Sequence, residues 1–442
     1  MRTNKAVLSL LLAFVFGAGY AATVTESQVK LAAKGWASRG GTLGAQVGLT
    51  VEKVMAHTTT NGAVFYAVKM TGGGTLFMSS DTDYAPIIAF TSSNVDFSSI
   101  DRKSPLWALL NRDVSSMKSA TAAAAQVAAD PAVKEKMLSF AAADAKLWRE
   151  LIAEGEAEKA ADGQLKYAEP IVSGNPGDLR AGPILKTKWS QSTSKGKACW
   201  NYYTPNGSNP SKFVEGDVNN AVCGCVATAM AQLMRYHQYP TASLSQLRRQ
   251  CNWGSSTMML TTRGGIYEWE KMPLVPASED NLSAEECQAI GKLTSDAGIS
   301  VYMQYSDDES GAFSFDMSGA LKDYWRYGSA VYFNSDNFSE ADLAAVSRKV
   351  LYSNFDAGLP VLMGIPGHQI LADGYGWNNE LEYVHLNMGW ADQPDVWYNL
   401  PEMQSAHPGF NSVDDFVYNV VPDGNDVSAV ISGRTLDADG KP

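Results

Sequence analysis

The stretch Ala221–Pro240, AVCGCVATAMAQLMRYHQYP, decides the fold of the chain. It passes from Cys-Gly-Cys to apolar residues at helical spacing, such as Val226, Met230 and Leu233, and a proline ends it. This pattern predicts a helix that begins at Cys225 and buries one face. Unpaired N–H groups and the dipole of a helix start favour a thiolate there, so we expect a lowered pKa for Cys225. The competing interpretation is a small buried cysteine that caps a core helix.

Composition limits the kinds of protein that this chain can be. Its 442 residues predict two or three domains. The contents of 45% hydrophobic and 19% charged residues are typical of a globular protein. The net charge of -12 argues against a nucleic-acid partner, because few basic residues are available to neutralise phosphates.

The N-terminus has the pattern of a secretory signal peptide. Arg2 and Lys5 precede the apolar run Ala6–Phe16, and small residues follow, which predicts a signal peptide over residues 1–21. The apolar run is too short to span a bilayer, so we expect a secreted protein without a membrane span. Export also permits disulfides among the five cysteines, and the odd number leaves at least one of them free. Cys225 is the candidate for the free cysteine.

The first half of the chain, residues 22–180, has the pattern of an α+β domain without catalytic residues. Thr25 and Gln28 fit a capping box, the runs Ala63–Met70 and Thr75–Ser80 fit a hairpin, and Asp130-Pro131 fits a helix start. A polar linker rich in proline and glycine follows at residues 164–182. A domain without chemistry, tethered by such a linker to one with a candidate nucleophile, is the layout expected of a pro-enzyme.

A nucleophilic cysteine needs a base, and His368 is the best candidate. It follows the apolar strand predicted at Val361–Ile365 and a Pro-Gly turn. Its separation from Cys225 falls within the roughly 130–150 residues found in papain-like enzymes. His237 lies three turns down the Cys225 helix and cannot reach the sulfur. His385 lies in a predicted strand, where a histidine is more often structural, and it remains the alternative base.

Three further residues complete a catalytic arrangement. The Asn387 side chain could accept the imidazole N–H and orient the ring, and Trp390 could cover that hydrogen bond. The Gln191 carboxamide could pair with the backbone N–H of Cys225 to form an oxyanion hole. The order Gln, Cys, His, Asn favours the joint interpretation over that of any single residue.

These motifs resemble the streptopain-like C10 family of secreted cysteine peptidases. The resemblance is carried by Gly224–Pro240, by Gly367-His368 through Asp373-Gly374 and, in part, by His385–Trp390. It implies an α+β, papain-like fold, with a helical lobe that carries the nucleophile Cys225 and a β-rich lobe that carries the base His368.

By the same resemblance, Asn387 is the orienting residue, Gln191 the oxyanion partner, and no cofactor or metal is required. The resemblance covers about residues 183–422, and residues 22–180 resemble an inhibitory propeptide. We therefore expect a peptidase domain over residues 181–422. Residues 423–442 include VSAVISGRTLDADGKP, which resembles the start of a C-terminal β-module and is otherwise a tail.

The predicted function is a secreted cysteine endopeptidase made as a zymogen, with protein or peptide substrates and its own propeptide as intramolecular inhibitor. A papain-like acyl transferase or amidase, and a non-catalytic binding module, are the alternatives. Cys223-Gly224-Cys225 lacks the Cys-x-x-Cys spacing of thiol oxidoreductases, and no paired Cys/His spacing indicates zinc. We also expect a disulfide between Cys199 and Cys223, which flank the loop before the nucleophile.

Overall fold

The structure is a computed structural model that describes residues 23–124, 131–160, 179–209, 213–335, 340–378, 381–391, 393–400 and 413–424. The predicted signal peptide, most of the predicted linker, and residues 425–442 therefore lie outside the described residues.

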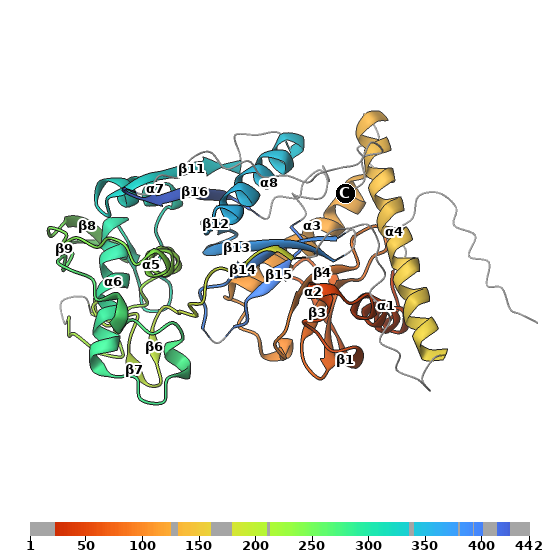
Figure 1. The fold of residues 1–442 in the computed structure, drawn as a ribbon, viewed down its shortest axis with the longest axis horizontal. Helices are drawn as coiled ribbons and strands as arrows, with labels where there is room; N and C mark the ends of the chain where they lie inside the picture. Colours follow the sequence, from red (N-terminus) through yellow and green to blue (C-terminus); the bar gives the residue numbers. More distant parts are fainter. Residues whose placement is uncertain are drawn as a thin grey trace, which may run out of the picture.

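Figure 1 shows the helices and strands that the described residues of the first half form. In chain order these are α1 (Glu26–Ser38), α2 (Gly41–Gly44), β1 (Thr50–Thr58), β2 (Val64–Thr71), β3 (Thr75–Ser79), β4 (Ile87–Thr91), α3 (Pro105–Ala124) and α4 (Pro131–Ala160), with the 3-10 turn η1 (Phe97–Ser99) before α3.

The second half has helices α5 (Cys225–His237), α6 (Ala284–Ser300), α7 (Ser314–Asp323) and α8 (Glu340–Asp356), with 3-10 turns η3 (Trp269–Lys271) and η4 (Pro276–Ser278). Its strands are β5 (Leu179–Ala181), β6 (Thr193–Ser194), β7 (Lys197–Ala198), β8 (Arg248–Trp253), β9 (Ser256–Thr261), β10 (Gln304–Tyr305), β11 (Tyr327–Asn334), β12 (Val361–Ile365), β13 (His368–Asn378), β14 (Leu381–Asn387), β15 (Val396–Tyr398) and β16 (Asp415–Pro422).

Local patterns produced several elements as predicted. Thr25 and Gln28 form a capping box that starts α1. Strands β2 and β3 pair as an antiparallel hairpin. Helices α1 and α4 pack closely at two glycines, since a Cβ on Gly35 would lie 2.0 Å from the Leu151 carbonyl oxygen and one on Gly155 would lie 2.1 Å from that of Leu31. Glycine at both points allows this contact.

The two halves share one antiparallel sheet, so the first half is not a detached module. The strand order is β1-β2-β3-β4-β15-β14-β13-β12-β16-β11, with β5 added beside β13. Strand β4 of the first half pairs with β15 of the second, with Phe90 opposite Trp397 and Ala89 opposite Tyr398. Figure 1 shows this junction in the middle of the molecule. The halves are thus continuous through backbone hydrogen bonds.

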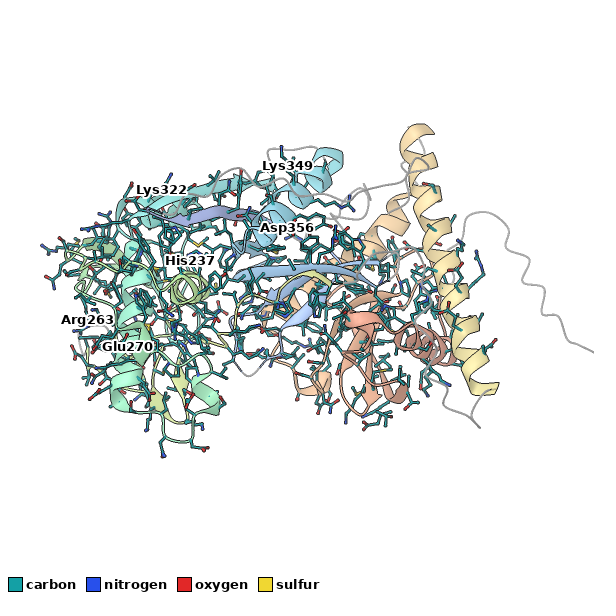
Figure 2. All side chains as sticks on the ribbon, in the orientation of Figure 1. His237, Arg263, Glu270, Lys322, Lys349 and Asp356 are labelled. Carbon is teal, nitrogen blue, oxygen red and sulfur yellow. The ribbon has the colours of Figure 1, made fainter. Side chains whose placement is uncertain are left out.

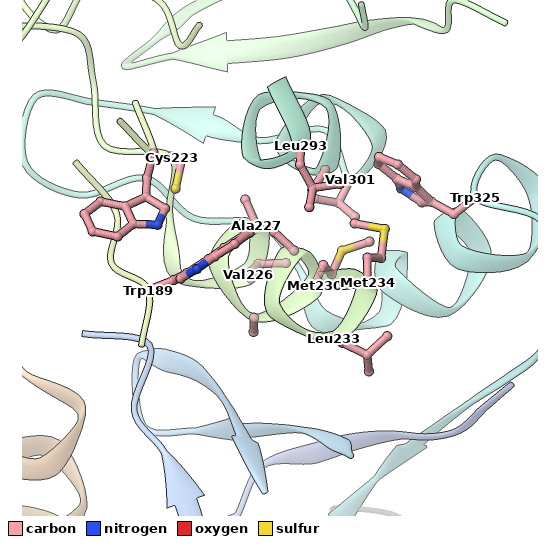
Figure 3. Close-up of a cluster of buried hydrophobic side chains, with 14 of the residues drawn as sticks. Trp189, Cys223, Val226, Ala227, Met230, Leu233, Met234, Leu293, Val301 and Trp325 are labelled. Carbon is pink, nitrogen blue, oxygen red and sulfur yellow. The ribbon is translucent and has the colours of Figure 1, made fainter. Parts of the chain in front are cut away.

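Burial follows the same division. Two hydrophobic cores contain residues from both halves, one of them joining Trp36 and Phe90 to Tyr383 and Trp397. A third core surrounds α5 and α6 and contains only residues from Leu185 onward. Figure 3 shows part of it, with Met230, Leu233 and other α5 side chains enclosed. We call the segment around this third core, residues 185–327, the helical lobe, and the eleven-stranded sheet the shared sheet.

Candidate active site

Cys225 is the first residue of α5, as the sequence predicted. Gly224 precedes it at a φ of 92°, and a Cβ there would lie 2.6 Å from the Ser310 carbonyl oxygen, so only glycine fits this turn. The backbone N–H groups of Gln369, Val226 and Cys225 itself point to the sulfur and favour the thiolate. Burial outweighs them and raises the pKa of Cys225. The expected lowering of its pKa is therefore wrong for this state of the chain.

His368 is the first residue of β13, directly after the turn that follows β12. The backbone N–H of its neighbour Gln369 donates to the Cys225 sulfur, so the start of β13 contacts the start of α5 where the helical lobe touches the shared sheet. The imidazole meets the Trp390 ring edge to face, with the ring centroids 5.8 Å apart. Burial lowers the pKa of His368. A hydrogen bond to the Lys103 carbonyl and the negative charges of Glu309 and Asp101 act in the opposite direction, but burial outweighs them.

The loop before α3 therefore reaches the candidate site from the first half of the chain. Besides its carbonyl contact with His368, Lys103 places its ammonium 2.8 Å from Asp308 and 3.1 Å from Glu309. Asp101 accepts the Lys103 N–H at 2.9 Å and so fixes the loop. No pattern in the sequence marked Lys103, because its partners are more than 200 positions away.

Asn387 has partners other than the imidazole that it was expected to orient. Its Oδ1 accepts from Gln232 Nε2 at 3.0 Å and from the Gly389 N–H at 3.1 Å, and its Nδ2 donates to the Thr187 carbonyl at 2.7 Å. The side chain is buried. Sequence reasoning missed Gln232, although a polar residue inside the apolar run of α5 was a signal that a buried partner was needed.

Gln191 lines a cavity of about 360 Å³ beside the site. Trp390, Trp200 and Asp308 also contribute to its walls. The Gln191 carbonyl accepts the Cys223 N–H at 2.8 Å, which ties the Gln191 segment to the loop that leads into the nucleophile.

His237 and His385 have structural surroundings. His237 hydrogen bonds with the Tyr327 hydroxyl at 3.2 Å, and burial lowers its pKa to about 4 (Figure 2). His385 Nδ1 lies 2.5 Å from Asp373 Oδ1, whose second oxygen accepts the Leu185 N–H. His385 thus helps to fix the start of the helical lobe.

All five cysteines lie in the described residues, and none of them forms a disulfide. The disulfide expected between Cys199 and Cys223 is therefore not formed in the structure. The Cys223 sulfur faces the Thr228 hydroxyl at 3.3 Å, whereas Cys199 contacts Cys287.

Within the described residues, no cluster of three or more His, Cys, Asp or Glu side chains could hold a metal ion. The same residues contain no helix that is both long and apolar enough to span a membrane.

Several known proteins resemble this chain in sequence or in fold. Residues 189–398 match the sequence pattern of the Peptidase C10 family. Streptopain of Streptococcus pyogenes is 30% identical over 220 residues, which cover 46% of this chain and 53% of streptopain. The chain thus spans about half the length of this curated relative.

Two other similarities extend beyond the C10 segment. The thiol protease/hemagglutinin PrtT of Porphyromonas gingivalis is 26% identical over 287 residues, or 62% of this chain and 32% of PrtT. A solved fragment of prointerpain A from Prevotella intermedia has a TM-score of 0.53 at 19% identity, covering 84% of this chain and 99% of the fragment. The predicted α+β, papain-like C10 fold is confirmed, and the similarity of fold extends beyond the C10 segment into the first half of the chain.

Proposed function

We propose that the chain is the zymogen of a secreted cysteine endopeptidase, with Cys225 as nucleophile and His368 as base. The observation that carries the proposal is that the N–H of Gln369, the residue next to His368, donates to the Cys225 sulfur, while the Lys103 carbonyl of the first half accepts from the histidine. Homology to C10 cysteine peptidases supports the reaction class. The name of the relative PrtT, a thiol protease, supports proteolysis. The signal-like N-terminus supports export.

In the proposed reaction, the Cys225 thiolate attacks the carbonyl carbon of a peptide bond. The Gln191 carboxamide and the Cys225 backbone N–H stabilise the resulting oxyanion. The His368 imidazolium then gives its proton to the leaving amine, and the acyl-enzyme remains. Water, activated by the neutral imidazole, hydrolyses the thioester and restores the thiolate and imidazolium pair.

Asn387 and Trp390 are proposed to position these groups. Asn387 is fixed by Gln232 on α5 and by Thr187, so it links the two walls of the site. Trp390 packs against the imidazole and limits its movement.

The first half is proposed to keep the pair inactive. Burial raises the pKa of Cys225 and lowers that of His368, so both groups are favoured in their neutral forms. The Lys103 carbonyl also occupies a hydrogen-bonding position of the imidazole. Removal of the loop would admit water to both groups and allow the thiolate and imidazolium to form. We therefore assign residues 22–180 as the inhibitory propeptide and residues 181–422 as the peptidase domain.

The test compares intact and processed protein. A Cys225→Ser precursor, incubated with a trace of mature enzyme, should be cut within residues 164–183. The wild-type precursor should hydrolyse peptides only after this cut, and a reaction mixture with added amines should show cleavage rather than transfer. Hydrolysis by uncut precursor at the mature rate would refute the assignment of the propeptide.

A further inference from the structure

Two buried cysteines outside the catalytic pair lie against each other. Cys199 follows β7, and Cys287 lies in the first turns of α6. Each is at most 1% exposed. The Cys199 thiol hydrogen bonds to the Cys287 sulfur. Cys223, Cys225 and Cys251 are the remaining cysteines of the chain.

The backbone around Cys199 runs alongside α6, so that residues earlier and later in this segment contact residues before and farther along the helix. Lys197 donates to the Leu282 carbonyl just before α6, at 2.6 Å. Thr294, farther along α6, donates to the Trp200 carbonyl at 2.6 Å. Cys199 therefore lies opposite the helical turn that begins with Cys287.

A glycine on α6 brings the two segments into close contact. Gly291 is one turn after Cys287, on the same helical face. A Cβ on Gly291 would lie 2.7 Å from the Cys199 carbonyl oxygen and 2.3 Å from the Tyr202 Cβ. The absence of a side chain thus allows Cys199 to approach the helix.

We propose that Cys199 and Cys287 form a structural disulfide when the chain folds in an oxidising compartment. The Cys199 thiol already donates to the Cys287 sulfur, and Gly291 lets the Cys199 backbone approach the same face of α6. The alternative partner, Cys223, is held by Thr228 through a hydrogen bond and by the backbone of its own loop. This pairing leaves the nucleophile Cys225 free.

The chemistry is a thiol–disulfide exchange with an external disulfide of the glutathione or oxidoreductase class. The Cys287 thiolate attacks one sulfur of that disulfide and forms a mixed disulfide, and the first external thiolate leaves. The Cys199 sulfur then attacks the Cys287 sulfur and displaces the second external thiolate. The two protons lost by the cysteines pass to the two released thiols. The hydrogen bond from Cys199 and, to a smaller extent, the charge of Lys197 lower the pKa of Cys287, so Cys287 is the better nucleophile for the first attack.

The bond would support one wall of the candidate active site. The hairpin of β6 and β7 lies between Gln191 and Cys199, and Trp200 together with Gln191 lines the cavity beside the site. A link from Cys199 to α6 fixes this segment to a helix that contributes to the core of the helical lobe. The inference rests on the proposed export, because a disulfide persists only in an oxidising compartment.

Peptide mapping tests the proposal on the full-length precursor carrying Cys225→Ser, which cannot process itself. The protein is folded in a buffer of oxidised and reduced glutathione, alkylated without reduction and digested with trypsin. Lysine and arginine residues separate Cys199, Cys223, Cys251 and Cys287 into four peptides. We expect the Cys199 and Cys287 peptides to be joined, and the Cys223 and Cys251 peptides to be alkylated. Full alkylation of Cys199 and Cys287, or a Cys199–Cys223 link, would overturn the proposal.

Thermal unfolding gives an independent measurement. Reductant should lower the melting temperature of the Cys225→Ser precursor by several degrees, as loss of a structural disulfide does. Cys199→Ser and Cys287→Ser should each remove this sensitivity, and the double variant should resemble either single one. Cys251→Ser, also at a buried cysteine, is the control that keeps the sensitivity. Because these measurements use protein without the nucleophile, their outcome is independent of whether the chain is a peptidase.

Discussion

The helical lobe and the shared sheet differ in what they require from the first half of the chain. The core of the helical lobe contains only residues from Leu185 onward. The shared sheet instead continues into β4, and its cores contain residues from both halves. Cys225 belongs to the part whose core contains no residue of the first half, and His368 to the part that the first half completes. If the first half is the proposed propeptide, this difference predicts that it acts mainly through the shared sheet and His368.

The largest expected effect tests whether both parts supply catalytic groups. Cys225→Ser and His368→Ala should each lower kcat/KM by about 10⁴-fold or more, because the two groups act as a unit. Asn387→Ala should leave measurable activity, since that residue positions others and transfers no proton. Peptide hydrolysis by processed enzyme measures this. Cys223→Ser is the matched control, and equal loss in that folded variant, or in His385→Ala, would contradict the assignments.

The next prediction concerns Phe90, which lies in one of the two cores that contain residues from both halves. Phe90 is fully buried among Trp36, Tyr383 and Trp397. Phe90→Ala should destabilise the precursor by about 3–5 kcal/mol, the usual cost for a buried Phe. It should also make the precursor leak activity, because the propeptide is held less tightly. Denaturant unfolding of the precursor in a Cys225→Ser background measures the loss of stability.

Leu293→Ala is the matched control in the helical lobe, where Leu293 is fully buried. It should destabilise precursor and processed enzyme alike, by about 2–5 kcal/mol. If it instead relieves inhibition as strongly as Phe90→Ala does, the distinction between the two parts is wrong.

The stability of the precursor should depend on pH because of two partly buried carboxylates, Asp144 on α4 and Asp81 after β3. Burial raises the pKa of Asp144 to about 7 and that of Asp81 to about 6. The folded state therefore holds these protons more tightly than the unfolded chain does. Their contribution to stability is full below about pH 4 and is lost as the pH rises through 6 to 7. The melting temperature of the Cys225→Ser precursor should thus be higher at pH 5 than at pH 8, and Asp144→Asn should reduce the difference.

The smallest expected effect concerns Lys103. Its ion pairs with Asp308 and Glu309 are exposed, and solvent screens such pairs so strongly that they contribute little. Lys103→Glu should therefore weaken inhibition only a few-fold, while Lys103→Arg should preserve it. The activity of uncut precursor measures the effect. A complete loss of inhibition in Lys103→Glu would mean that the ion pairs, rather than the shared sheet, hold the propeptide.

Local signals in the sequence predicted the elements of this fold, but not the contacts between its halves. The α5 helix, the Thr25 capping box and the β2–β3 hairpin depend on neighbouring residues and formed as expected. The pairing of Ala89 with Tyr398 joins distant segments and has no local signal. It emerges only when the sheet is assembled.

The same distinction explains the site. The motif around Cys225 and the turn before His368 predicted that these residues begin a helix and a strand, because their immediate neighbours set their positions. The pKa of Cys225 was predicted in the wrong direction, since burial by distant segments outweighs the helix start. The Lys103 contact and the Gln232–Asn387 hydrogen bond were missed for a related reason, because each depends on residues far apart in the chain.

The most direct test of the central claim is the rate at which a thiol-directed epoxide labels Cys225, measured before and after processing. The account predicts that the wild-type precursor is labelled only slowly while uncut, and that the processed enzyme is labelled rapidly and at Cys225 alone. His368→Ala in the processed enzyme should slow the labelling, because the imidazolium no longer stabilises the thiolate. Equal labelling rates in uncut and processed protein, with the label mapped to Cys225, would contradict the account.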